Sequence, residues 1–323
     1  MDTVWLAITN LANSNSGFDY AYVCYSSSIF KIYIASYIRG GNILKLKMEK
    51  IAPLFLFFSA FLWSLGGIFT KSVAWNGICL ATLRGLIAIV VSGLMLLNHK
   101  IKLSFAKVLA GICYFAQGVL FMSANKYTTS ANATVLQNTS PFYIILFNAL
   151  IYKKKPSKSE CVTCVCLLVG VSLAFVGNLD GGGTKGNTMA LASSIFYAGV
   201  FFLSKDKSAN PLESLFIGNL CYLIFVPAML TNQAVRGTTS SEWVFLLVFA
   251  TLTGIAAWLC FAAGIKHTSA LQASFITISE PVMVPIWTFV FLHETITPLA
   301  IVGCVIVIAT LLTYNLKAAR TCS

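Results

Sequence analysis

Glu280 is the residue whose type and position most strongly suggest chemistry, because it stands inside the apolar stretch ITISEPVMVPIWTFVFLHET, residues 276–295. A carboxylate deep in a membrane span costs roughly 2.5–3.5 kcal/mol to insert, so such residues are candidates for function. Pro281 follows at once and lacks a backbone N–H, so a helix kink is expected here. Glu280 is therefore either a group that binds protons or substrate, or a brace for the kink. Glu294, at the end of the stretch, is expected to be solvated at the membrane boundary.

Arg84 is the second charged candidate and lies about seven residues into another apolar run, which contains LATLRGLIAIVV. A guanidinium stays protonated in proteins, so it must find an anion or extend toward the membrane surface. Two interpretations follow: a helix anchor that bonds a carbonyl or carboxylate, and a group that faces substrate. Glu280 is one candidate partner.

Two prolines are each preceded by a pair of polar residues whose spacing places them on one helix face. The pairs and their prolines are Thr134 and Asn138 before Pro141, and Ser274 and Thr277 before Pro281. Aromatic and amide side chains also stand at the interiors of apolar runs, namely Trp63, Tyr114, Gln117, Tyr197 and Trp258. We expect this set to line an amphipathic cavity. Hydrogen bonding between helices is the alternative for each polar residue.

The composition places these residues in a membrane. Hydrophobic residues make up 58% of the 323-residue chain and charged residues 10%, whereas a soluble domain carries about 25% charged residues. A run of about 20 apolar residues crosses a bilayer. Ten such runs predict an all-α membrane protein with ten transmembrane helices: 51–72, 77–97, 104–124, 130–152, 159–178, 187–204, 212–232, 243–264, 270–292 and 297–316.

The basic residues predict the orientation. If the N-terminus is cytoplasmic and the ten spans alternate, fifteen Lys and Arg fall inside and four outside, which are Lys71, Lys126, Lys185 and Arg236. This asymmetry follows the positive-inside rule and predicts a multi-pass protein of the plasma (inner) membrane with both termini cytoplasmic. It also explains the net charge of +12 without a nucleic-acid partner.

Residues 1–47 do not fit the pattern of spans. They contain neither a clean apolar span nor the charged start and apolar core of a signal peptide. Met48 stands directly before the first good span. We expect residues 1–47 to be a mis-assigned start or a disordered tail, with a functional tail as the alternative.

The chain also repeats itself. At a shift of 140 residues, NKYTTSANATVLQNTSP (125–141) falls on IKHTSALQASFITISEP (265–281), and at about 133 residues FLWSLGGIF (61–69) falls on SIFYAGVFF (194–202). The repeat predicts two halves of five spans, 51–178 and 187–316. Because five is odd, the halves enter the membrane from opposite faces, which is the inverted repeat of secondary transporters.

Other chemistries find little support. CVTC (161–164) has the spacing of metal ligands, but the sequence has no second cysteine pair or histidine cluster to complete a site, so no metal site is expected. GGGTKG (181–186) lacks the ending of a phosphate-binding loop. No cofactor and no enzymatic activity are expected.

Several of these stretches resemble the EamA type of the drug/metabolite transporter superfamily. They are FLWSLGGIFTKS, LATLRGL, YTTSANATVLQNTSPF and HTSALQASFITISEPVMVPIWTFVFLHETIT, within about 51–316. The resemblance implies export of small metabolites or amino acids by alternating access, coupled to protons, with Glu280 as the proton-sensitive group. One departure is that Ser140 stands where the second half has Glu280, and YKKK (152–155) where many members carry a glutamate.

Two alternatives stay open. One is a multidrug exporter, and the other is a membrane receptor or scaffold that does not transport. The expected partners are a small-molecule substrate, the lipid bilayer and protons, and the oligomeric state is not predicted.

Overall fold

The computed structural model describes residues 42–97, 99–128, 130–174, 183–283, 287 and 298–321. Within these ranges the chain is helical, without β-strands. Contacts divide the chain into Met1–Lys47 and Met48–Ser323, and the second unit is the subject below. Most of the N-terminal extension and Glu294 lie outside the described residues.

The first described helix begins at Asn42, within the N-terminal extension. The helices of the first half are α3 (Asn42–Ser64), α4 (Gly66–Lys71), α5 (Gly77–Leu96), α6 (Phe105–Tyr127), α7 (Ser130–Gln137), α8 (Ser140–Ile151) and α9 (Lys158–Ala174). Side-chain caps start two of the long ones, because Asn76 accepts from the Cys79 N–H and Ser104 from the Lys107 N–H.

The second half is helical in the same way but more often interrupted. Its elements are α10 (Thr184–Leu203), α11 (Pro211–Leu220), η2 (Cys221–Phe225), α12 (Val226–Thr231), α13 (Gln233–Arg236), α14 (Ser240–Phe249), η3 (Ala250–Ala256), α15 (Ala257–Ile265), α16 (Ala270–Thr277) and α18 (Pro298–Thr321).

Five helical stretches among the described residues are long and apolar enough to cross a membrane. They are Gly77–Leu96, Phe105–Tyr127, Thr184–Leu203, Pro211–Thr231 and Ser240–Ile265, and two shorter apolar helices are Ile51–Ser64 and Ile301–Tyr314. The prediction of an all-helical membrane protein is therefore confirmed. The count of ten spans in two inverted halves stays a prediction.

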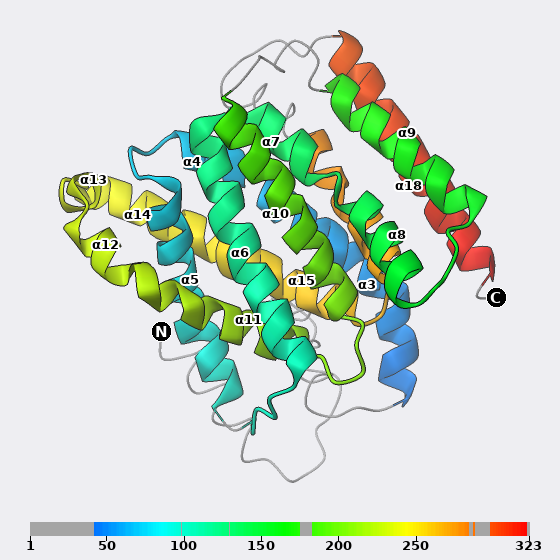
Figure 1. Ribbon diagram of the computed structural model, residues 1–323, viewed down its shortest axis with the longest axis horizontal. Helices are drawn as coiled ribbons and strands as arrows, with labels where there is room; N and C mark the ends of the chain where they lie inside the picture. The colour runs from blue at the N-terminus through cyan, green and yellow to red at the C-terminus, as the bar shows by residue number, and fades with distance from the viewer. Residues whose placement is uncertain are drawn as a thin grey trace, which may run out of the picture. The chain divides into compact units, whose positions relative to one another are not determined.

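The core is built by helices from both halves. α6 packs most extensively against α10 and also against α11, while α5 packs against α11 and η3. At the crossing of α6 and α11, a Cβ atom added to Gly111 would lie 2.9 Å from the backbone nitrogen of Gly218. Small residues let two helix backbones approach this closely. α9 and α18 lie side by side and pack mainly on each other (Figure 1).

Three interruptions of regular helix lie in the core. α7 ends at Gln137 and α8 begins at Ser140, while α16 ends at Thr277 and helix resumes over 279–283. Each restart places a proline, Pro141 or Pro281, in the first turn of the new helix, where its missing N–H is not needed. The third interruption is the π-helical η3. Interruptions of this kind change which backbone groups are available for other contacts.

Candidate functional site

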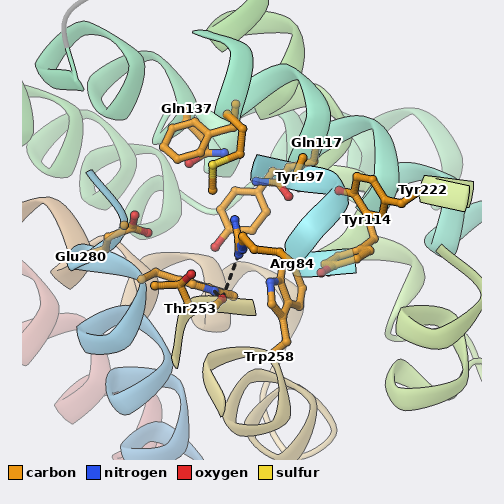
Figure 2. Close-up of a pocket in the computed structure, with 15 residues that line it drawn as sticks. Arg84, Tyr114, Gln117, Gln137, Tyr197, Tyr222, Thr253, Trp258 and Glu280 are labelled. Atoms are coloured by element: carbon orange, nitrogen blue, oxygen red, sulfur yellow. Dashed lines mark hydrogen bonds between the residues drawn. The ribbon is translucent and has the colours of Figure 1, made fainter. Parts of the chain in front are cut away.

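A central cavity lies among helices of both halves, and Figure 2 shows the side chains that face it. The empty space between its side chains, including the part that opens to solvent, measures about 570 Å³. Most of this space is too narrow for a water molecule, so the cavity admits only a few of them. Seven residues singled out from the sequence meet here: Trp63, Arg84, Tyr114, Gln117, Tyr197, Trp258 and Glu280. The rest of the lining is Gly66, Ala81, Gly118, Phe121, Met122, Gln137, Tyr222 and Thr253.

Arg84 lies in the middle of the group, with Glu280 on one side and Tyr114 and Tyr222 on the other (Figure 2). Its Nη2 donates to the carbonyl oxygen of Thr253 at 2.8 Å. The guanidinium carbon also lies 5.7 Å from the centre of the Phe249 ring, within the range of a cation–π contact. Its Nε is buried and has no hydrogen-bond partner among the described residues. Arg84 is thus anchored through one nitrogen and keeps another donor for the cavity.

The Thr253 carbonyl is available because η3 is π-helical. The Ala257 N–H donates to the carbonyl of Leu252, whereas in a regular α-helix it would donate to that of Thr253. The Thr253 oxygen instead accepts from Arg84 and, at 3.2 Å, from Nε1 of Trp63. The backbone carbonyl therefore ties α3 and α5 of the first half to the second half.

Glu280 follows the interruption after α16 and is 8% exposed. No described side chain or backbone group hydrogen-bonds its carboxylate, and Arg84 does not come within ion-pair distance of it. The Glu280 carboxylate nevertheless lies near enough to Arg84 and to the Tyr197 hydroxyl for a coulombic interaction with each. An unpaired charge is costly to bury. The carboxyl group is therefore suited to take up a proton or a positively charged group.

Aromatic side chains form one wall of the cavity. The ring centres of Trp63 and Trp258 are 4.8 Å apart, and those of Tyr114 and Trp258 are 4.3 Å apart, both edge to face. Tyr197 packs edge to face on Trp63 at 6.1 Å. Edge-to-face pairs of this kind are favourable, so in this conformation the rings present an ordered apolar surface with polar edges.

Three of the eight lining residues that were not anticipated from the sequence contribute polar groups. Gln137 ends α7, and its Nε2 is buried without a hydrogen-bond partner in the ranges that the structure describes. The 140-residue shift places it on Thr277, the last residue of α16, which is the signal that could have found it. Tyr222 packs on Gly85 and Gly118, which have no side chains in its way. Thr253 contributes a backbone oxygen, which residue type alone cannot indicate.

Four predicted polar residues, Thr134, Asn138, Ser274 and Thr277, are buried but do not line this cavity. Asn138 donates to the Thr134 carbonyl at 2.9 Å, and Ser274 donates to the Leu271 carbonyl at 2.8 Å. Thr277 donates to the Ser274 carbonyl at 2.9 Å. The side chains of Asn138, Ser274 and Thr277 thus donate to backbone carbonyls next to the interruptions. Thr277 also interacts with the Tyr197 hydroxyl, which does line the cavity.

The sequence matches the EamA-like transporter family twice, over residues 50–176 and 184–316. The chain belongs to the EamA-like transporter family. The predicted resemblance is thereby confirmed. A solved crystal structure shares the fold with a TM-score of 0.70 at 19% identity, covering 85% of this EamA-like chain and 99% of that chain.

Two bacterial proteins are also similar to this EamA-like chain. An uncharacterized transporter of Clostridium kluyveri is 25% identical over 203 residues, which cover 58% of this chain and 65% of that protein. The uncharacterized transporter YcbK of Bacillus subtilis is 22% identical over 208 residues, 60% of this chain and 67% of that protein. The chain thus spans about two thirds of the length of these relatives.

Proposed function

We propose that this protein is a secondary active transporter that exports small metabolites or amino acids across the plasma membrane by alternating access, with proton coupling. In this proposal ten spans form two inverted halves, 51–178 and 187–316, with both termini cytoplasmic. The observation that carries the proposal is the cavity itself. It brings the Glu280 carboxylate and the Arg84 Nε, neither of which is hydrogen-bonded by a described residue, to the same space inside an apolar helical chain.

Two features support alternating access. The helices containing Pro141 and Pro281 are interrupted at positions that correspond under the 140-residue shift, and paired broken helices frame the substrate site in many transporters. The cavity is also too narrow for a metabolite as it stands. A substrate could therefore enter only after helices of the two halves move apart.

The donors in the cavity support a substrate with a carboxylate. The Arg84 Nε–H and the Gln137 Nε2 are buried and find no acceptor in the described part of the chain, and such groups favour a ligand that supplies oxygen atoms. The aromatic wall of Trp63, Tyr114 and Trp258 can pack on an apolar portion of the same molecule. A small amino acid or organic acid satisfies both requirements.

The charge on Glu280 sets the charge of the substrate that the cavity accepts. With Glu280 ionised, it balances Arg84 and the cavity suits a zwitterion, whose ammonium group can approach the carboxylate. With Glu280 protonated, the cavity carries the charge of Arg84 alone and suits an anion. Either way the protonation state of Glu280 and the bound substrate depend on each other, which is the requirement for coupling.

The test is flux in proteoliposomes containing the purified protein, with an imposed pH gradient. We expect small amino acids and organic acids to move and their amide analogues, which lack the carboxylate, to move much more slowly. A matched control is Glu160→Gln, because Glu160 caps α9 through the Ser157 N–H and lies away from the cavity. Absence of flux for every carboxylate tested would contradict the proposal.

The aromatic wall and Glu280 also fit the second candidate, a multidrug exporter of organic cations. Arg84 opposes it, because a fixed positive charge in the cavity repels cations. Flux of unrelated lipophilic cations without flux of carboxylates would favour this candidate. Binding without flux would favour a receptor or scaffold.

A further inference from the structure

A buried group of charges lies outside the central cavity, around the first turn of α11. Nζ of Lys107 lies 2.7 Å from Oε2 of Glu213, and Nε2 of His99 lies 3.1 Å from Oε1. Asn210 also donates to Oε1 at 2.8 Å. The side chains of Glu213 and Lys107 are 3% and 9% exposed, and that of His99 is 47% exposed. We call Glu213, Lys107, His99 and Asn210 the Glu213 cluster.

The cluster joins the two halves of the chain. Lys107 lies in the first turn of α6 and His99 follows α5, both within the first family match, whereas Asn210 and Glu213 start α11 in the second. The opposite end of α5 is also held to the second half. There Nε1 of Trp75 donates to Oγ1 of Thr238 at 2.7 Å, and the rings of Trp75 and Trp243 are 5.1 Å apart. α5 is therefore clamped at both ends, by charge at one and by aromatic packing at the other.

A second small space lies beside the start of α11 and shares lining residues with the central cavity. Tyr114 and Trp258 line both spaces. The second space is also lined by residues that include Ser204, Pro211 and Ser214. Ser214 directly follows Glu213, and its Oγ is buried with no hydrogen-bond partner among the residues described. A polar atom without a partner in an apolar core fits a surface that becomes wet in another conformation.

A purely structural role explains this cluster poorly. Well-packed apolar residues stabilise a buried site at least as well as an ion pair does, whereas losing one partner leaves an uncompensated charge. Such a pair holds two elements in one arrangement and releases them when water reaches it, because solvation replaces the lost attraction. That behaviour suits a contact that has to form and break.

We infer that the transport path runs from the central cavity, between Tyr114 and Trp258, into the second space, and that the Glu213 cluster is the gate that closes this path. The inference rests on the proposed transport function. The predicted orientation places the start of α11 on the cytoplasmic side, so the structure has this inner gate closed. Substrate reaches the cavity from the cytoplasm when α11 moves away from Lys107 and His99.

The test measures access to the path without any substrate. Ser204→Cys reports on the second space and Gln117→Cys on the central cavity, each in a chain whose native cysteines are replaced. Labelling by a membrane-impermeant methanethiosulfonate reagent is followed in inside-out and right-side-out vesicles. We expect Glu213→Gln to raise the labelling rate of both reporters at least about tenfold from one face, because it removes two charge-assisted contacts. Glu160→Gln should leave the rates unchanged.

A second variant separates gating from loss of folding. Lys107→Met combined with Glu213→Leu removes both charges and leaves an apolar contact, so labelling should stay at or below the wild-type rate. The inference is overturned if Glu213→Gln labels like Glu160→Gln in both vesicle types, or if the apolar pair labels as fast as Glu213→Gln. Because labelling needs no substrate, its failure is distinct from a failure of wild-type flux, which would count against the proposed function instead.

Discussion

Replacing Arg84 by lysine separates the two roles that a buried arginine can have here. Lysine keeps the positive charge, but its three N–H donors share one nitrogen. A lysine nitrogen placed on the Thr253 carbonyl cannot also occupy the position of Nε, whereas the planar guanidinium of Arg84 holds Nη2 on Thr253 and Nε toward the cavity at the same time. The variant therefore loses one charge-assisted hydrogen bond. Such a bond is worth about 1.5–3 kcal/mol, which corresponds to roughly a 10- to 150-fold change in affinity.

If the lost bond is the one to substrate, the apparent KM of Arg84→Lys for the transported carboxylate should rise by about that factor in proteoliposomes. The thermal midpoint in detergent, followed by tryptophan fluorescence, should change little because the nitrogen on Thr253 is retained. Arg84→Gln should transport still less because the charge is gone. An unchanged KM together with a clearly lowered thermal midpoint would refute the reasoning and make Arg84 a helix anchor.

Three further outcomes are expected. Glu280→Gln should remain folded but lose the response of flux to an imposed pH gradient, since its amide cannot exchange a proton; unchanged gradient-driven flux would remove Glu280 from the coupling. Gly254→Ala should lower substrate affinity a few-fold, because the new Cβ would lie 3.3 Å from Cβ and 3.4 Å from Nε of Arg84. The control in the same KM assay is Gly237→Ala, whose new Cβ would contact only the Gln233 carbonyl oxygen, at 3.4 Å. A cysteine at Thr184 should react with an impermeant reagent outside intact cells while one at Lys155 stays protected, and the reverse pattern would overturn the predicted orientation.

The sequence could predict the side chains of the cavity better than its backbone. Arg84 and Glu280 were predictable because a charged residue in an apolar run must face the protein interior or water. The Thr253 carbonyl was not, because its role depends on the hydrogen-bond register of η3, and the apolar pattern of ATLTGIA does not reveal a π-helix.

The Glu213 cluster is a second feature that the sequence could not predict. A glutamate in the first turn of a helix is expected on electrostatic grounds alone, so PLESLF gave no reason to single out Glu213. Its burial depends on Lys107, which lies 106 positions earlier in the chain. One sequence shows that both residues exist but not that they meet. The repeat, by contrast, was visible because it is found by aligning the sequence with itself. The same alignment could also have identified Gln137.

The partner that η3 offers to Arg84 has a genetic consequence. Because the acceptor is a main-chain oxygen, substitution of Thr253 by alanine leaves it in place, and an alanine scan would not detect this contact. The contact is instead vulnerable to a change in length. Deleting one residue from the seven of η3 would restore regular α-helix, and the Thr253 oxygen would then accept from the backbone N–H four residues later. Single-residue deletions across Ala250–Ala256 are therefore the variants in which this part of the site becomes visible to selection.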